Sequence, residues 1–124
     1  MGSDGPTRVE DVMSTPLVTI APDESVQRAA EIMVEEDIAA LIVTASVEGI
    51  VTSTDIIETV AAGEDLRELT VADVMTEDVE TVTPDLYMEE VAAMLAALEI
   101  KHLPVVDGDY VGMISSSDVT AHLS

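Results

Sequence analysis

Gly112–Asp118 (GMISSSD) is a second copy of Gly49–Asp55 (GIVTSTD), and this duplication decides how the other segments of the 124-residue chain are interpreted. Upstream, VEDVMS at Val9–Ser14 returns as VADVMT at Val71–Thr76, TIAPD returns as TVTPD, and IAAL returns as IKHL. These three segments recur after 62 residues and the final motif after 63, so one extra residue near Asp107–Asp109 explains the shift. Because order and spacing hold along nearly the whole chain, the sequence predicts two related units that bury a shared face.

Hydrophobic periodicity within each repeat predicts alternating strands and helices. Strands are predicted from short β-branched or buried runs at residues 18–20, 41–43, 49–51, 79–82, 103–106 and 111–114. Helices are predicted at residues 25–36, 55–62, 88–98 and 118–123, from the spacing of apolar residues and from the residues that end each segment. Ser25 is expected to be the N-cap of its helix, and Gly63 is expected to follow the C-terminus of another.

These elements define an α/β (α+β) fold. Two pseudo-twofold-related β-α-β-β-α units are expected to form one compact module. The predicted boundaries are residues 8–62 for the first repeat, 63–70 for a short linker and 71–124 for the second repeat. The linker is polar and short, which favours neighbouring units over independent domains.

The charge balance is extreme, with 26 acidic and 4 basic residues and a formal net charge of −22. Such a surface repels nucleic-acid backbones and anionic membranes, so neither is expected as a partner. The acids are scattered and 48% of the residues are hydrophobic, which favours a folded domain with an acidic coat over a disordered tail. The composition resembles that of proteins from salt-in halophilic prokaryotes, and an acidic face for a basic partner is the alternative.

The sequence lacks residues that several functional classes require. Cysteine is absent, which excludes disulfides and thiolate metal sites. The first residues do not resemble a secretory signal and no apolar run could span a bilayer, so a cytoplasmic location is expected. His102 and His122 are the only histidines, and neither a phosphate loop nor a serine elbow is present. We therefore expect no catalytic residue, no metal site and no enzymatic activity, with a nucleotide hydrolase or transferase as the least favoured alternative.

The end of the duplicated motif joins a strand to a helix, and its chemistry has two interpretations. Gly112 would let another backbone approach closely. The helix N-terminus and the Ser115 hydroxyl would favour an anion, and the Asp118 carboxylate could accept hydrogen bonds from ribose hydroxyls. Alternatively, Ser115 and Asp118 are ordinary residues of a helix cap. The spacing alone leaves both interpretations open.

In combination, VxDVM, TVxPD, IKHLPVVD and GMISxxD resemble the CBS (cystathionine-β-synthase) domain family, as a tandem pair over about residues 8–124. The resemblance implies a regulatory module that binds AMP, ADP, ATP or S-adenosylmethionine in clefts between the repeats and needs no other cofactor. It implies that binding is relayed to a regulated protein that the sequence does not identify. A ligand-free CBS module for protein interaction or dimerisation is the alternative.

The resemblance also implies a stronger binding site centred on Asp118 for ribose and Ser115 for ribose or phosphate. The other residues expected at this nucleotide site are Met13, Ser14, Val18, Lys101, His102 and Met113. Lys101 and His102 would contact phosphate, although a surface pair with Glu99 or simple packing would also explain them. Met113 could stack on the base or fill the core.

A second, weaker site is implied around Asp55 and Thr52. The other residues expected there are Ala40, Met75, Thr76 and Glu80. Ala39 and Ala40 replace the two basic residues of the stronger site, and Glu80 opposes an anion, so a neutral or sulfonium ligand would suit this site better. Arg8 is a further candidate for contacting phosphate.

The resemblance finally implies a homodimer formed through helix faces. The residues expected on these faces are Val91, Met94, Leu95 and Leu98 in one helix, and Val26, Ala30 and Met33 in the other.

Overall fold

The computed structural model describes residues 7–15 and 17–123, and the chain divides into two compact units. Unit 1 joins Met1–Leu17 to Glu80–Ser124, whereas unit 2 is the continuous segment Val18–Val79. Neither unit coincides with one sequence repeat. The segment that opens each repeat instead belongs to the unit that contains the rest of the other repeat.

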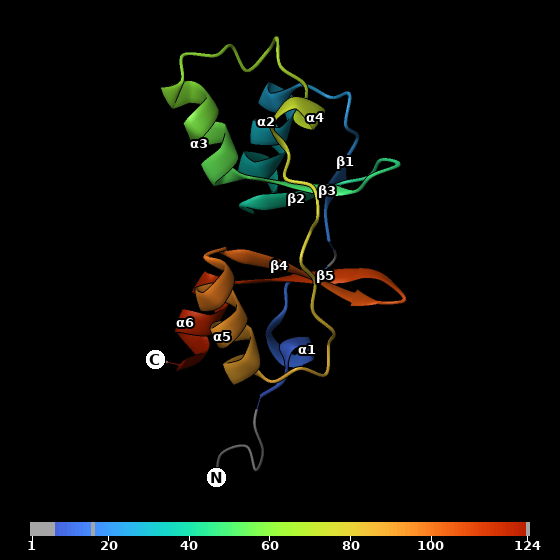
Figure 1. Ribbon diagram of the computed structural model, residues 1–124, viewed down its shortest axis with the longest axis vertical. Helices are drawn as coiled ribbons and strands as arrows, with labels where there is room; N and C mark the ends of the chain where they lie inside the picture. The colour runs from blue at the N-terminus through green and yellow to red at the C-terminus, as the bar shows by residue number, and fades with distance from the viewer. Residues whose placement is uncertain (1–6, 16, 124) are drawn as a thin grey trace. The chain divides into compact units, whose positions relative to one another are not determined.

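Unit 2 is a three-stranded sheet with helices on one face, as Figure 1 shows. Its elements are β1 (Thr19–Ile20), α2 (Val26–Glu36), β2 (Ala40–Val43), β3 (Gly49–Thr52), α3 (Ser53–Ala61) and α4 (Val71–Val74). β1 is parallel to β2, and β2 is antiparallel to β3. Leu41 and Val51 from the sheet, Ala29 from α2 and Val71 from α4 are fully buried in one core.

Unit 1 repeats this arrangement with a two-stranded sheet (Figure 1). Its elements are α1 (Val9–Val12), α5 (Met88–Leu98), β4 (His102–Asp107), β5 (Asp109–Ser115) and α6 (Ser116–Leu123). β4 and β5 form an antiparallel hairpin. Val9 from α1, Val91 from α5, and Leu103 and Ile114 from the hairpin are fully buried in its core.

The strand predicted at residues 79–82 is wrong, because only Val82 pairs. Its N–H donates to the Pro104 carbonyl at 3.0 Å, and its carbonyl accepts from the Val106 N–H at 2.8 Å. Asp78 lies just before this segment in the left-handed region (φ 56°), and Pro84 follows two residues after Val82. These two breaks leave a single parallel bridge where unit 2 has β1.

The predicted helix boundaries are largely confirmed. The Ser25 Oγ accepts a 3.0 Å hydrogen bond from the Arg28 N–H, which caps α2 as expected. Gly63 follows α3 with φ +80°, a conformation that an L side chain rarely adopts. Local sequence signals were sufficient here because both interactions are made within a few residues of the helix end.

The faces expected to form a homodimer are mostly internal. Val26 and Val91 are fully buried, and Met33 and Leu95 are nearly so, because these side chains fill the cores of the two units. Leu98 is exposed. The four buried side chains are therefore not available to a second copy.

Two helices end on acidic residues in a strained conformation. Asp37 after α2 and Glu99 after α5 are left-handed, with φ 56° and 55°. This conformation costs a residue with a side chain about 1–2 kcal/mol, and a carboxylate at a helix C-terminus also opposes the helix dipole.

Replacing Glu99 by glycine should relieve this strain. Glu99→Gly is expected to raise the free energy of unfolding by about 1 kcal/mol, measured by urea denaturation. Glu99→Ala removes the same charge and keeps the strain, so its gain should be smaller. Equal stability of the two variants would show that the backbone conformation is not the cause.

Candidate functional site

Unit 1 joins β5 to α6 through a reciprocal cap. The Ser115 N–H and hydroxyl donate to Oδ2 of Asp118 at 2.8 and 2.9 Å, and the Asp118 N–H donates to the Ser115 Oγ at 3.2 Å. No hydrogen bond with another described residue is made by the Asp118 Oδ1. The cap therefore fixes the carboxylate and leaves one of its oxygens available to a ligand hydroxyl.

The start of β4 lies beside this cap. His102 is paired with Ser115 across the hairpin, and the Lys101 carbonyl accepts a 2.9 Å hydrogen bond from the Ser116 N–H. Burial lowers the pKa of His102, and the Asp118 charge raises it less than burial lowers it. Burial therefore favours the neutral form of the imidazole. Lys101 is exposed and forms no ion pair with any residue that the structure describes.

The segment that opens the first repeat pairs with β5. The Ser14 N–H donates to the Met113 carbonyl at 2.8 Å, and the Met113 N–H donates back at 3.1 Å. A Cβ on Gly112 would lie 2.8 Å from the Ser14 carbonyl oxygen and 2.9 Å from the Met13 sulfur. The close approach expected at Gly112 therefore exists, and the approaching backbone is the protein's own.

Unit 2 contains a matching junction between β3 and α3. The Thr52 N–H and hydroxyl donate to Oδ2 of Asp55 at 2.8 and 3.0 Å, and the Asp55 N–H donates to the Thr52 Oγ1 at 3.3 Å. Thr76 and Ile50 exchange two 2.9 Å backbone hydrogen bonds, as Ser14 and Met113 do in unit 1. Ala40, paired with Thr52, takes the position of His102.

The structure therefore brings most of the expected residues together, one set in each unit. Met13, Ser14, Lys101, His102, Met113, Ser115 and Asp118 lie in unit 1, and Ala40, Thr52, Asp55, Met75 and Thr76 lie in unit 2. Val18 and Glu80 each belong to the unit opposite to the site for which they were expected.

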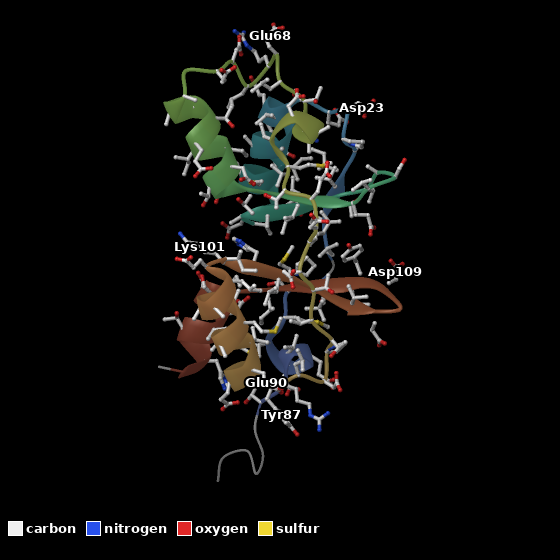
Figure 2. The ribbon with its side chains drawn as sticks, in the orientation of Figure 1. Asp23, Glu68, Tyr87, Glu90, Lys101 and Asp109 are labelled. Carbon is white, nitrogen blue, oxygen red and sulfur yellow. The ribbon has the colours of Figure 1, made fainter. Side chains whose placement is uncertain are left out.

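Arg8 is held away from the unit 1 junction. Its guanidinium lies 5.3 Å from the centre of the Tyr87 ring, just before α5 begins, whereas Lys101 follows the other end of that helix. Eleven helical residues span about 16 Å. Figure 2 shows Tyr87 and Lys101 at opposite ends of α5, so Arg8 is not gathered with Lys101.

One feature of unit 1 was missed at the sequence level. A hollow of about 260 Å³ lies between α5 and α6. It is lined by Ala92, Leu95, Ala96, Ile100, Ser116, Val119 and Thr120. Its signal was the run of small residues in α5, which stands where α2 carries larger ones.

Two features are absent from residues 7–15 and 17–123. No three histidine or acidic side chains gather in a way that could hold a metal ion. No helix in this part of the chain is long and apolar enough to cross a membrane.

The family model of the CBS domain matches residues 9–62 and, a second time, residues 71–124. The chain belongs to the CBS domain family. Both matches include a strand–helix junction with its Ser or Thr and its Asp. The CBS pair is thus the recognised unit, and the two compact units are assembled from segments of both its domains.

Proteins of different kinds contain a segment similar to this CBS pair. It is 34% identical to a homoserine O-acetyltransferase of Methanohalobium evestigatum over 92% of this chain, but it spans only 24% of that enzyme. The CBS pair of protein MJ0100, solved with 5′-methylthioadenosine and S-adenosylmethionine, is 30% identical, with a TM-score of 0.86 over 96% of this chain and 97% of that one. A hexameric CBS-CP12 protein from bloom-forming cyanobacteria is 31% identical, with a TM-score of 0.91 over 96% of this chain and 73% of that one.

Proposed function

We propose that this CBS pair is a regulatory module that binds an adenosine-containing ligand at the β5–α6 junction and catalyses no reaction. The observation that carries the proposal is the Asp118 carboxylate, fixed by Ser115 at a helix N-terminus, with one oxygen free of described partners. The MJ0100 CBS pair, of similar length and fold, was solved with two adenosine compounds, which supports this ligand class.

An adenine nucleotide (AMP, ADP or ATP) suits the unit 1 junction best. Asp118 would accept hydrogen bonds from the ribose hydroxyls, while Lys101 and the N-terminus of α6 would face the phosphate. His102 would act as a hydrogen-bond partner, and Met13 and Met113 would offer apolar contact to the base. The ligand would then bridge segments of both repeats within one compact unit.

The β3–α3 junction is proposed as the weaker site. Its Thr52–Asp55 cap has the same geometry, but Ala39 and Ala40 replace the basic pair. In a chain with a net charge of −22, a phosphate at this junction would lack local compensation. A ligand with a neutral or sulfonium tail, such as S-adenosylmethionine, fits this junction better.

The relay would begin at the Met13–Ser14 segment. Leu17 is the last residue of this part of unit 1, so the chain enters unit 2 at Val18, four residues after Ser14. A ligand that holds Ser14 and α6 together would shift the module between arrangements only if it binds them unequally. The responding protein is proposed to be a cytoplasmic partner, and the module is proposed to act as a homodimer.

Asp118→Ala tests the site. Calorimetry with AMP, ADP, ATP and S-adenosylmethionine in molar KCl should detect binding of an adenosine ligand, weakened at least tenfold in this variant. Asp73→Ala is the matched control, because the Thr70 N–H and hydroxyl donate to Oδ2 of Asp73 at 2.8 and 3.0 Å, as those of Ser115 do to Asp118. Each variant should lose about 1 kcal/mol of stability with its cap, but only Asp118→Ala should lose affinity.

Failure to bind any of the four compounds would favour a ligand-free interaction module. The same cap supports this alternative, because Ser115 and Asp118 form hydrogen bonds with each other in the absence of a ligand. Equal affinities of Asp118→Ala and the unsubstituted chain would exclude the β5–α6 junction as the site.

A further inference from the structure

Oxidisable sulfur in this chain is confined to methionine side chains, because the sequence has seven methionines and no cysteine. Met33 and Met88 are buried in the cores of the two units, at 6% and 0% exposure. Met13 and Met75 are half-buried, and each lies directly before an exposed residue. A small oxidant in solution can therefore reach Met13 and Met75 more readily than the two buried methionines.

In unit 1, the Met13 side chain lies against a buried glycine of β5. A Cβ at Gly112 would be 2.9 Å from the Met13 sulfur and 2.8 Å from the Ser14 carbonyl oxygen, so the sulfur and this carbonyl border the same small space. The carbonyl accepts the 3.1 Å hydrogen bond from the Met113 N–H that joins this segment to β5. The thioether therefore packs beside the acceptor of a backbone hydrogen bond.

Unit 2 repeats this arrangement at the end of α4. A Cβ at Gly49 would be 2.7 Å from the Met75 sulfur and 3.0 Å from the Thr76 carbonyl oxygen. That carbonyl accepts a 2.9 Å hydrogen bond from the Ile50 N–H. The same contact between a methionine, a strand glycine and a backbone acceptor thus occurs once in each unit.

Oxidation of the thioether would change what this contact can hold. A methionine sulfoxide is polar, and its oxygen accepts hydrogen bonds but donates none. Beside Gly112 the new oxygen would face the Ser14 carbonyl, which is also an acceptor, and would compete with it for the Met113 N–H. The added atom also needs volume where the side chains already meet closely. Each effect favours separation of the segment from its strand.

We propose that Met13 and Met75 are oxidation sites at which a hydroperoxide, such as hydrogen peroxide, releases the opening segment of each repeat from its strand. The sulfur lone pair attacks one peroxide oxygen, and an S–O bond forms as the O–O bond breaks. The displaced oxygen takes the proton of the transferred hydroxyl and leaves as water. The sulfur loses two electrons, and the peroxide gains them.

The proposal has a consequence for the β5–α6 junction. The Met13–Ser14 segment forms one side of the proposed adenosine site, so its release would weaken ligand binding. This consequence rests on the proposed function, whereas the oxidation and the release do not.

Mass mapping of peptides after treatment with hydrogen peroxide in molar KCl tests the oxidation. Met13 and Met75 should each gain one oxygen before Met33 and Met88 do, in a chain that circular dichroism shows to be folded. Oxidation of all four at equal rates, or of the two buried methionines first, would overturn the proposal.

Amide hydrogen exchange, measured by NMR, tests the release. The Met113 and Ile50 N–H groups donate across the two contacts, so oxidation should make their exchange about tenfold faster or more. The Arg28 N–H, which the Ser25 side chain caps within α2, is the internal control and should keep its rate. Unchanged exchange at Met113 and Ile50 in chains that carry the sulfoxides would contradict the release.

Leucine variants assign each release to its own sulfur. In Met13→Leu, peroxide should leave the Met113 amide protected and still expose that of Ile50, and Met75→Leu should show the reverse. Met113→Leu is the matched control, because it removes a half-buried methionine of the same strand and keeps the sulfur at Gly112, so the unit 1 response should persist. A unit 1 response that survives in Met13→Leu would overturn the proposal. Oxidised and unoxidised molecules of the unsubstituted chain provide the same comparison without any substitution.

Calorimetry with AMP separates this proposal from the proposed function. Affinity for AMP should fall in the oxidised chain, together with protection of the Met113 amide. Failure of the untreated chain to bind AMP would count against the proposed function alone, because the mass and exchange measurements need no ligand. Unchanged AMP affinity in a chain whose Met113 amide has lost protection would overturn the link between the segment and the ligand site.

Discussion

Residues 18–79 expressed alone are expected to fold, whereas residues 1–62, a fragment of the same length, are expected to remain unfolded. The first fragment is compact unit 2, and the second is one sequence repeat with its N-terminal residues. The difference is α4, which supplies the fully buried Val71 to the unit 2 core. The repeat has a copy of this helix in α1, but α1 belongs to unit 1.

The fragment of residues 1–62 also lacks the backbone hydrogen bonds that residues 69–72 form with the rest of unit 2. The Val71 and Ala72 N–H groups donate to the Glu24 and Pro22 carbonyls at 2.8 and 3.0 Å, and the Val26 N–H donates to the Leu69 carbonyl at 2.9 Å. Domains of about 60 residues are marginally stable, so the loss of one side of the core is decisive.

Circular dichroism and urea denaturation of both fragments measure the difference. Residues 18–79 should show a cooperative transition and residues 1–62 should show none. Equal transitions in the two fragments would mean that α1 can replace α4 within its own repeat, which contradicts the exchange of segments.

Gly112→Ala is expected to reduce both stability and ligand binding. The added Cβ would lie 2.8 Å from the Ser14 carbonyl oxygen, which is backbone, and 2.9 Å from the Met13 sulfur. Overpacking of this kind costs about 1–3 kcal/mol, and the Ser14 segment must move away from β5. Because that segment forms one side of the proposed site, affinity for the adenosine ligand should fall together with the urea midpoint.

Gly49→Ala is the matched control in unit 2. Its Cβ would lie 2.7 Å from the Met75 sulfur and 3.0 Å from the Thr76 carbonyl oxygen, so a similar loss of stability is expected. Binding at the Asp118 site should persist in this variant. Unchanged affinity in Gly112→Ala would show that the Met13–Ser14 segment does not form part of the site.

Local patterns in the sequence predicted the elements whose determinants are local. The helices over 26–36 and 88–98 follow from apolar spacing, and the Ser25 cap and the turn at Gly63 follow from residue type. The strand predicted at 79–82 was wrong, because the left-handed conformation of Asp78 and the proline at 84 outweigh its β-branched residues. The hollow between α5 and α6 was missed because the apolar spacing of α5 predicts which residues are buried and does not predict where the helix surface lacks large side chains.

Assignment of segments to units required more than periodicity. Val9–Val12 and Val71–Val74 have nearly the same sequence and form the same short helix, so no local signal distinguishes their positions. The family resemblance, which pairs the opening segment of one repeat with the Asp of the other, anticipated that Met13 and Ser14 join Ser115 and Asp118 in unit 1. It could not place Arg8, because the contact with the Tyr87 ring involves two side chains outside the motifs that carry the resemblance.

The exchanged helices α1 and α4 also bear on how such a chain could arise. A solitary ancestral repeat that made the same exchange would have had to take this helix from another molecule, and its folding would then have depended on protein concentration. Fusion of two copies of the gene supplies each helix from within the same polypeptide, at a high and constant effective concentration. Duplication in this family thus converts a bimolecular assembly step into a unimolecular one.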